Sequence, residues 1–396
     1  MSNDNSSRLT RRSLLRQSLL CASAWIYDSN LLRFPGSLLR RTSDAQGKDS
    51  MLGLIPFSDE GHPPMGQPIG TELDGRLFTD LSTLTPEHPV TSTENFFIRT
   101  RASKLLNTSA PWTIHLTGLV EKPTTLSPES LAKKARPMGT HLMECSGNTR
   151  TAHFGMMSIA AWDGVPLEEI LEISKLLATR TRVLISGFDQ YQEESMTSEP
   201  GASWIFTPDE LLSSKAFLAT KMNGEPLRAD HGAPIRLIVP GWYGCACVKW
   251  VNQIEFVSDY APATSQMQEY ASRTMQTGVP TLARDYRPAV MDVAAMPTRI
   301  EKWRIAGKIR YHVLGLQWGG SGIRPAMEIR IGSQESFVPI QNVSPSPAGN
   351  CSFWAYDWSP SRTGTFAIRL RPKPANVAAR RLDSGYYDRS VDIAEI

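Results

Sequence analysis

Apolar and polar side chains alternate along several short stretches of the chain, and this alternation predicts strands. Between positions 112 and 120 it has the two-residue period of a strand with one buried face. The same period recurs at 309–313, 327–331 and 366–370, where glycine, serine and proline separate the runs. Such runs are typical of a β-sandwich of about 100 residues. We therefore predict an all-β domain at positions 286–396.

The stretch before position 286 mixes helix and strand signals. Ser127 followed by Pro128 predicts a helix start, with the serine as N-cap and the proline at the first helical position. A second helix is predicted at 164–171, and the β-branched run 235–240 ends at a proline. These elements do not alternate regularly, as they would in a doubly wound parallel sheet. An α+β domain is therefore predicted for positions 49–285.

Positions 1–48 carry the features of a leader and linker. Arg11 and Arg12 stand just before a short apolar stretch, and the pair resembles a twin-arginine export signal. Residues 22–24, Ala-Ser-Ala, offer a small-residue cleavage site. These features predict a periplasmic protein that is exported in the folded state. The alternative is a basic amphipathic helix at a frayed terminus.

The export signal is tested by changing both Arg11 and Arg12 to lysine. Folded protein should then remain in the cytoplasm, because the twin-arginine route recognises its cargo by this pair. Cell fractionation measures the distribution, with the unchanged chain as the control. Undiminished periplasmic accumulation of the double variant would rule the signal out.

Composition and charge exclude several classes of protein. Hydrophobic residues make up 41% of the 396 residues and charged residues 20%, which is the balance of a soluble globular protein and not of a disordered one. The formal charge of +3 gives no reason to expect binding to nucleic acid. No apolar run approaches the roughly 18 residues of a membrane-spanning helix.

Five cysteines are scattered along the chain, and their odd number argues against a disulfide framework. None of them forms a Cys-x-x-Cys pair, so neither a zinc ribbon nor a covalently attached c-type haem is expected. Cys245 and Cys247 stand one residue too close for the usual metal loop. We predict that they are two strand residues whose side chains point the same way.

Cys145 is the cysteine with the most informative neighbours. It lies in a stretch rich in serine, glycine and asparagine, and Arg150 follows five residues later. A nearby cation can hold a cysteine as the thiolate at neutral pH, and the thiolate is the form that ligates metals. On spacing alone, however, a single cysteine is more often a small buried apolar residue.

The surroundings of Cys145 resemble the Glu-Cys-(Ala/Ser)-Gly-Asn-x-Arg signature of the sulfite oxidase family. Further blocks resemble the same family and follow in the same order, from about residue 90 to 390. These blocks are 96–99, 144–150, 162–167, 222–227, 230–236, 240–244, 248–250 and 316–320. The resemblance implies an α+β catalytic domain of the sulfite oxidase type, followed by an immunoglobulin-like dimerisation domain. It also implies a homodimer.

The resemblance implies a molybdenum–pterin cofactor whose metal is bound by the thiolate of Cys145. The pterin carries a phosphate, which favours arginine, lysine and backbone N–H groups as partners. Taken alone, His231 would be predicted to cap a turn, and Arg236 and Lys249 to be solvated strand cations. The positions that match the family's cofactor-binding residues are Phe97, Ile98, Arg99, Thr100, Arg101, Asp189, His231, Arg236, Cys247, Val248 and Lys249.

The resemblance also implies a pocket for a small oxyanion. Arg99 and Arg150 match arginines that flank the metal in the family, and two guanidinium groups bind an oxyanion in a bidentate way that lysine cannot copy. Tyr270 falls near a tyrosine that the family keeps beside the metal, although it could equally be an ordinary core tyrosine. The loop after Cys145 is shorter than in sulfite oxidases, and Phe154 is the aromatic residue nearest to their pocket tryptophan.

These features favour a sulfite oxidase or dehydrogenase that converts sulfite to sulfate by oxo transfer. No haem-bearing segment is recognised, so the electrons are expected to pass to an external acceptor such as a cytochrome c. The enzymatic alternative is the reverse transfer, from a sulfoxide or N-oxide. The C-terminal domain argues against it, because the family's periplasmic sulfoxide reductases lack this domain. A catalytically silent cofactor-binding protein is the second alternative, and the trio of Cys145, Arg99 and Arg150 argues against that.

Overall fold

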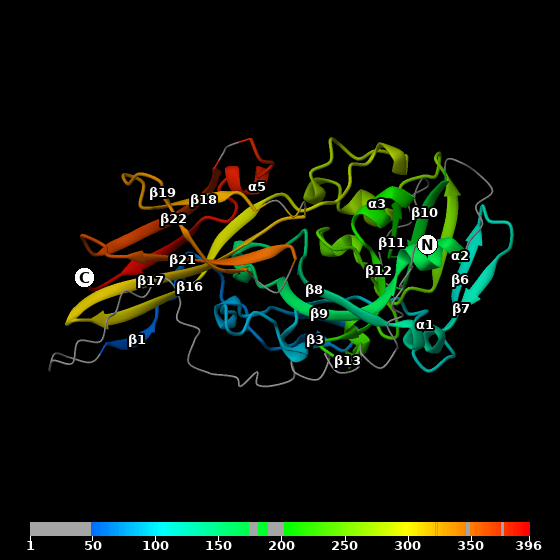
Figure 1. Cartoon of the computed structure of the whole chain (residues 1–396), viewed down its shortest axis with the longest axis horizontal. Helices are drawn as coiled ribbons and strands as arrows, with labels where there is room; N and C mark the ends of the chain where they lie inside the picture. Colours follow the sequence, from blue (N-terminus) through cyan, green and yellow to red (C-terminus); the bar gives the residue numbers. More distant parts are fainter. Residues whose placement is uncertain are drawn as a thin grey trace, which may run out of the picture. The chain divides into compact units, whose positions relative to one another are not determined.

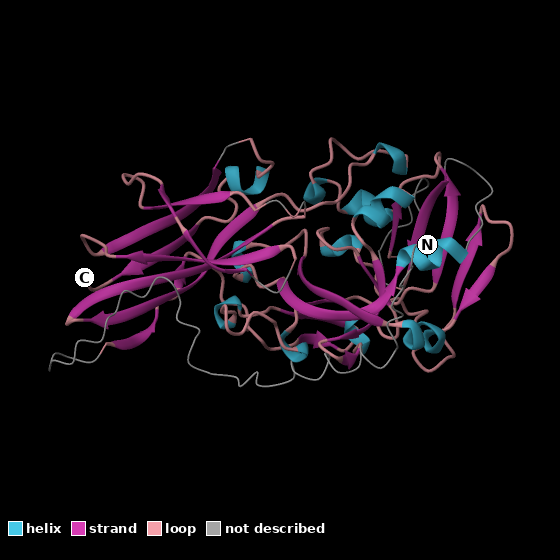
Figure 2. Cartoon of the chain, in the orientation of Figure 1, coloured by secondary structure: helices cyan, strands magenta, loops and turns pink. Residues whose placement is uncertain are grey.

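The computed structural model of the chain describes residues 49–173, 181–188, 202–320, 322, 324–345, 349–373 and 376–396. The predicted export signal lies outside these residues and stays a prediction. Strands make up most of the regular secondary structure in the described residues, and the helices between them are short (Figure 2). The longest α-helices of the described residues have seven residues. The part of the chain expected to be α+β thus contains much less helix than the sequence signals suggested.

The first of two five-stranded sheets in the N-terminal part is mixed. Strand β15 runs parallel to β6, and the other neighbouring pairs are antiparallel. Strands β6 and β15 are far apart in sequence, and the long segment between them contains most of the candidate site residues. Their pairing brings the two ends of this segment together. The sheet order is β11 (Ser203–Phe206), β10 (Thr181–Ser186), β15 (Gln253–Ser258), β6 (Ile114–Gly118) and β7 (Thr124–Leu126).

The second sheet is antiparallel and carries the Cys145 loop. Its two longest strands pair from Arg136↔Gly164 to Glu144↔Met157, which brings the two ends of that loop together. The sheet order is β13 (Glu225–Pro226), β12 (Phe217–Met222), β9 (Met157–Pro166) and β8 (Arg136–Glu144), with β14 (Arg236–Ile238) paired to β12. A separate three-stranded sheet consists of β3 (Ile69–Thr71), β4 (Asp74–Leu77) and β5 (Ile98–Arg99). The candidate site residue Arg99 is the last residue of β5.

Two antiparallel five-stranded sheets form the C-terminal part, which Figure 1 shows as two layers of long strands. They pack through contacts such as Trp358 against Phe366, whose ring centroids are 5.0 Å apart. One sheet has the order β1 (Ser50–Leu54), β16 (Ala294–Ile305), β17 (Lys308–Trp318), β21 (Cys351–Trp358) and β20 (Gln341–Pro345). The other has the order β19 (Val338–Pro339), β18 (Ala326–Ile331), β22 (Gly364–Lys373), β23 (Arg389–Ile393) and β2 (Phe57–Ser58).

Strands β1 and β2 were not anticipated, and they bring residues 50–58 into the C-terminal sheets. The predicted division between 285 and 286 therefore does not separate all the strands of the two parts. Where the independent domains begin and end stays a prediction. The immunoglobulin-like topology of the two C-terminal sheets stays a prediction as well.

The described helices connect the strands. The α-helices are α1 (Pro128–Lys134), α2 (Leu167–Ile173), α3 (Pro208–Ser213), α4 (Ser265–Glu269) and α5 (Arg380–Asp383). The 3-10 helices are η1 (Leu81–Thr83), η2 (Thr93–Asn95), η3 (Arg150–Ala152), η4 (Ala229–His231), η5 (Gly244–Ala246), η6 (Ser272–Thr274) and η7 (Ala283–Asp285). No described helix has both the length and the apolar character needed to cross a bilayer.

Most of the element predictions are confirmed. Helix α1 begins as expected, with Ser127 as N-cap in a capping box and Pro128 in the first turn. The alternating runs are strands β6, β17, β18 and β22, and their apolar members are buried. The predicted second helix starts later than expected, at Leu167, because β9 extends through the Gly-Val-Pro sequence before it.

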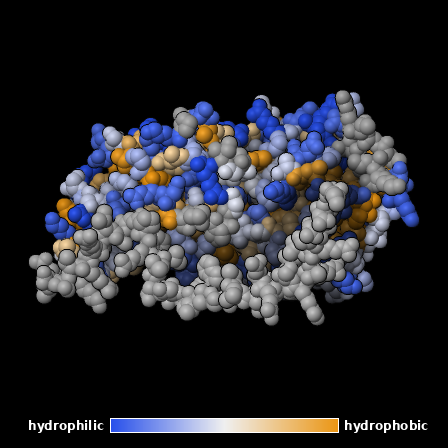
Figure 3. All heavy atoms as spheres, viewed as in Figure 1, coloured by the Kyte–Doolittle hydropathy of each residue, from blue (hydrophilic) through white to orange (hydrophobic). Residues whose placement is uncertain are grey.

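Figure 3 shows hydrophilic and scattered apolar residues on the described surface of one face.

Candidate active site

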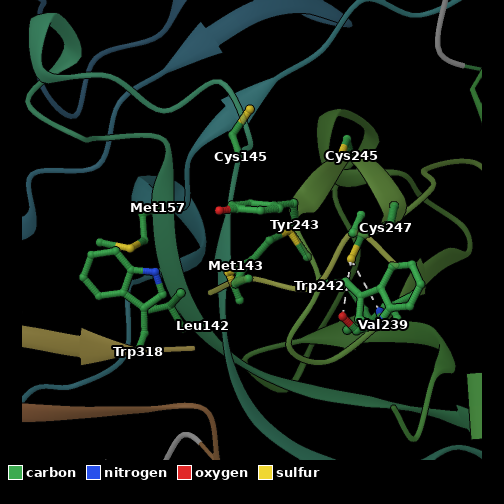
Figure 4. Packing of buried hydrophobic residues seen from close by; sticks show 14 of the residues in the cluster. Leu142, Met143, Cys145, Met157, Val239, Trp242, Tyr243, Cys245, Cys247 and Trp318 are labelled. Carbon is green, nitrogen blue, oxygen red and sulfur yellow. Dashed lines mark hydrogen bonds between the residues drawn. The ribbon is translucent and has the colours of Figure 1, made fainter. Parts of the chain in front are cut away.

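Cys145 follows directly after β8 and lies in a short buried loop. Its N–H donates to the carbonyl of Met156 at 2.9 Å, and its own carbonyl accepts from the N–H of Asn148 at 2.9 Å. The side chain of Asn148 accepts from Met156 N–H at 3.0 Å and so fixes the other end of the loop. Cys145 is only 5% exposed. Figure 4 shows it in the same buried cluster as Tyr243, Cys245 and Cys247.

A cavity of about 60 Å³, which we call the inner cavity, opens beside Cys145. Many of the residues assigned to the cofactor by resemblance line it, although they come from distant parts of the sequence. Its lining comprises Phe96, Phe97, Ile98, Arg99, Met143, Cys145, Ala202, Asp230, His231, Arg236, Gly244, Cys245, Cys247, Val248, Lys249, Gln266 and Tyr270.

Lys249 reaches the inner cavity because two glycines let its backbone pass closely. A Cβ on Gly187 would lie 2.0 Å from the carbonyl oxygen of Lys249, and one on Gly232 would lie 2.8 Å from the lysine Cβ. Gly232 also has a φ of +98°, which side-chain-bearing residues rarely adopt. The Nζ of Lys249 donates to Arg99 O at 3.0 Å and to Thr100 Oγ1 at 2.6 Å.

His231 and Arg236 bring polar groups to the same cavity. His231 ends η4 and packs edge-on against Phe96, and burial lowers its pKa to about 4, so the ring is neutral at pH 7. Arg236 is buried, and its guanidinium donates to His231 O at 3.1 Å and lies 5.6 Å from the centre of the Trp162 ring. The site therefore combines a neutral imidazole with the charge of a buried guanidinium.

Two of the predicted cofactor residues that the structure describes, Thr100 and Arg101, do not line the inner cavity. Thr100 is buried behind it, and its hydroxyl contacts two residues of the lining, Lys249 and Asp230. Arg101 is exposed and does not line either cavity described here. Asp189 lies outside the described residues, so its predicted role stays a prediction.

A wider cleft of about 670 Å³, which we call the outer cleft, lies on the other side of the Cys145 loop. Arg99 lines both spaces and so marks where they adjoin. Among the described residues, four arginines and no acidic residue line the outer cleft, which makes it cationic. Two of these arginines also face carboxylates outside the lining: Arg99 lies 3.8 Å from Glu269 and Arg381 lies 4.0 Å from Glu144. The lining comprises Pro63, Arg76, Phe78, Arg99, Ser146, Gly147, Thr149, Thr151, Ala152, Met156, Ser272, Arg273, Met275, Arg381, Ser384 and Tyr386.

Arg150 lines neither the inner cavity nor the outer cleft, and its predicted role beside the metal stays a prediction. The chain turns into η3 at Arg150, and the guanidinium extends to the carbonyl of Gly385 at 3.5 Å. Arg273 lines the outer cleft and lies near Tyr270. Its Cζ lies 5.2 Å from the centre of the Tyr270 ring, and the Cζ of Arg99 lies 5.3 Å from the same point.

The electrostatics of Cys145 agree with this arrangement. Burial raises the pKa of its thiol, and Arg99 and then Arg273 are the cations that oppose the rise. Arg150 makes no such contribution among the causes of the shift. The guanidinium of Arg150 points toward the C-terminal segment. Its predicted stabilisation of the thiolate stays a prediction.

Residues 102–265 match the family model of the oxidoreductase molybdopterin binding domain. Sulfite oxidase of Arabidopsis thaliana is 28% identical over 178 residues, which are 40% of this chain and 45% of that protein. The chain carries a molybdopterin-binding domain of the sulfite oxidase family.

Other relatives of the molybdopterin domain differ in activity. A nitrate reductase (NADPH) of Aspergillus niger is 30% identical over 274 residues, 62% of this chain and 31% of that protein. The catalytic subunit of a protein-methionine-sulfoxide reductase of Xanthomonas axonopodis is 28% identical over 269 residues, 65% of this chain and 78% of that protein. The match to the nitrate reductases covers less than a third of their length.

A solved structure shows the same fold. The crystal structure of the sulfane dehydrogenase SoxCD from Paracoccus pantotrophus superposes with a TM-score of 0.61 at 19% identity. The match covers 83% of this chain and 88% of that one, so it extends beyond the molybdopterin domain. At this identity, the likeness concerns the fold alone.

The inner cavity of the molybdopterin domain offers groups that fit a molybdenum–pterin cofactor. Cys145 supplies one soft sulfur, which suits a metal whose other sulfur ligands come from the cofactor. Arg236 and Lys249 supply the positive charge that an anionic phosphate needs. Gln266 is 4% exposed, and its Oε1 has no hydrogen-bond partner in the part of the chain that the structure describes. A pterin N–H is a suitable donor for this oxygen.

Several residues of the two spaces were not found from the sequence. Arg273, Gln266 and Arg381 lie outside the matching blocks, and each reaches the site from a different helix or turn. Arg273 stands three residues after Tyr270, a spacing that places two residues on the same side of a helical turn. That spacing was the one available signal.

Two further predictions about this region need correction. Cys245 and Cys247 are not strand residues, because Cys245 lies in η5 and Cys247 is its C-cap. Both are nevertheless buried, and both line the inner cavity. Phe154, proposed as the nearest aromatic to the pocket, is fully buried against Tyr386 and Tyr387 and lines neither space.

Proposed function

We propose that the chain is a molybdenum–pterin oxidoreductase that oxidises sulfite to sulfate. The observation that carries this proposal is the cationic outer cleft beside Cys145, with four arginines and no acidic side chain among the described residues of its lining. A cleft of this charge attracts a small dianion and disfavours cations. The relationship to sulfite oxidases supports the choice of sulfite among small anions.

Cys145 would ligate the metal, and the inner cavity would hold the pterin. Bound there, the cofactor would supply the exchange of an oxygen atom and of two electrons. We expect the side chains that line the inner cavity to adjust as the cofactor enters. We expect Lys249 to turn from the oxygens of Arg99 and Thr100 toward the phosphate.

The side chains of the outer cleft bind and orient the substrate. Arg99 and Arg273 both line the outer cleft, and both act on the thiol of Cys145, so we expect the two guanidinium groups to bind one oxyanion near it. Burial raises the pKa of Tyr270, so its hydroxyl stays protonated and can donate a hydrogen bond to the anion. Conversion of sulfite and water to sulfate releases two protons and two electrons. The open cleft lets the protons pass to solvent.

The remaining elements of the proposal concern partners and location. An external acceptor such as a cytochrome c would take the electrons one at a time. The two C-terminal sheets would form the immunoglobulin-like dimerisation domain, and the chain would act as a homodimer in the periplasm. The division at 285/286, the export signal and the dimer are each part of this proposal.

The charge of the outer cleft discriminates sulfite oxidation from sulfoxide reduction. A sulfoxide is neutral and gains little from a cluster of guanidinium groups, whereas sulfite gains charge-assisted hydrogen bonds. Purified protein should therefore reduce ferricyanide or cytochrome c with sulfite. Reduced viologen with methionine sulfoxide should give much slower turnover. Faster turnover of methionine sulfoxide or nitrate than of sulfite would contradict the proposal.

The use of sulfite should also depend on salt. Raising sodium chloride from about 0.01 M to 0.15 M shortens the screening length from about 30 Å to 8 Å. The added chloride also competes for the guanidinium groups. We expect the KM for sulfite to rise several-fold with little change in kcat. Steady-state kinetics at several salt concentrations measure this, and a KM that does not change would argue against an anionic substrate.

A further inference from the structure

Glu144, the residue before Cys145, is completely buried, and its carboxylate is held by side chains from distant parts of the chain. Trp318 Nε1 donates to one carboxylate oxygen at 3.0 Å. The hydroxyl of Tyr387 donates to the other at 2.9 Å. Arg381 has a guanidinium nitrogen 4.0 Å from that second oxygen. Three groups of the C-terminal part therefore meet at the residue next to the candidate metal ligand.

The backbone of the Cys145 loop is held by the same C-terminal segment. Arg381 donates to the carbonyl of Ser146 at 2.6 Å, and the hydroxyl of Tyr386 donates to the carbonyl of Asn148. Before the loop, Asn350 bonds both to the N–H and to the carbonyl of Leu142, each at 2.9 Å. The loop is thus bound to the C-terminal part at its start, at its centre and through the side chain of Glu144.

Trp318 and Tyr387 also contact each other, with ring centroids 5.1 Å apart. Both rings are buried, and neither lines the inner cavity or the outer cleft. Each presents one polar atom to Glu144 and otherwise packs in the core. A buried carboxylate that loses a hydrogen-bond donor is destabilised, because nothing then compensates for the water that it lost on burial. Each of these hydrogen bonds therefore restricts the position of the Glu144 carboxylate.

We propose that Trp318 and Tyr387 are positioning residues that fix the Cys145 loop through Glu144. The C-terminal pair of sheets then sets the geometry of the thiol. The inference rests on the proposed function only in taking Cys145 as the metal ligand. Under this proposal the C-terminal part contributes to the geometry of the site, so a structural change in these sheets would alter the position of Cys145.

The test compares two variants of the full, cofactor-loaded chain with two matched controls. Trp318→Phe and Tyr387→Phe each remove one donor to Glu144. Trp354→Phe and Tyr311→Phe remove donors from two other buried rings of the C-terminal part, whose partners are the carbonyls of Leu316 and Glu395. Hydrogen exchange of the amides at 145–150 measures how often the loop opens.

The two test variants should raise exchange in the loop by about tenfold, which corresponds to about 1.4 kcal/mol. The controls should leave it within about twofold even if they lower the overall stability. Equal effects of all four variants would overturn the proposal, since the loop would then respond only to global stability. No effect of Trp318→Phe and Tyr387→Phe would overturn it as well.

A double-mutant cycle tests whether Tyr387 acts through Glu144. In a Glu144→Gln background, Tyr387→Phe should change loop exchange by much less than in the unchanged chain. Additive effects would show that Tyr387 acts by another route and would overturn the proposal. Loop exchange needs no substrate, so a failure of the protein to oxidise sulfite is a separate result that refutes the proposed function alone.

Discussion

Replacing Cys145 by serine is expected to lower kcat/KM for sulfite by more than about 100-fold while the protein stays folded. Changes beyond the direct ligands of a metal already cost about 10- to 100-fold, and this change alters the ligand itself. Serine has nearly the volume of cysteine, and the backbone of Cys145 is anchored to Met156 and Asn148 independently of the sulfur. Its oxygen is a harder ligand that donates less charge.

Cys351→Ser is the matched control for this variant. Cys351 is also fully buried, but it lies in β21 of the C-terminal part and lines neither space. We expect it to lower stability modestly and to leave sulfite kinetics unchanged. Circular dichroism and thermal unfolding report whether both variants fold. Equal loss of activity in Cys145→Ser and Cys351→Ser would show that the effect is structural.

Replacing Arg273 by glutamine should reduce kcat/KM for sulfite by about 10- to 150-fold. The change removes a charge-assisted contact to the anion worth roughly 1.5–3 kcal/mol. Most of the loss should appear as a higher KM, because the guanidinium binds the anion before the reaction as well as during it. Turnover of a neutral sulfoxide should change far less.

Arg150→Gln provides the control for Arg273→Gln, because the family motif predicts a substrate arginine at 150, whereas Arg273 is the one of the two that lines the outer cleft. Arg150 extends to Gly385 and lines neither space, so we expect its replacement to alter kcat/KM by less than about threefold. The reverse ranking of the two variants in sulfite kinetics would mean that the motif, and not the position of Arg273, identifies the substrate contact.

The strands and the cofactor candidates could be predicted because their signals are local. The two-residue alternation at 309–313 and 366–370 depends only on which face of a strand is buried, and the start of α1 depends on Ser127 and Pro128. His231, Arg236 and Lys249 were placed by short blocks of sequence. The structure brings the three together because β14 and the turns beside it hold them around one cavity.

The features that could not be predicted depend on contacts between distant residues. Nothing near Arg150 shows that η3 turns its side chain toward Gly385, because Gly385 is supplied by a segment 235 residues later. The burial of Glu144 depends in the same way on Trp318 and Tyr387. Strand β1 is mostly exposed and shows no two-residue alternation, and β2 has only two residues. Both form because the C-terminal sheets offer edges to pair with.

The central claim is that Cys145 binds the molybdenum of a pterin cofactor, and X-ray absorption at the metal tests it most directly. The purified full chain and Cys145→Ser are compared after metal and pterin analysis of both. We predict that molybdenum and pterin are present in equal amounts in the unchanged protein, and that the metal in Cys145→Ser has one sulfur neighbour fewer. The same number of sulfur neighbours in both proteins would contradict the account.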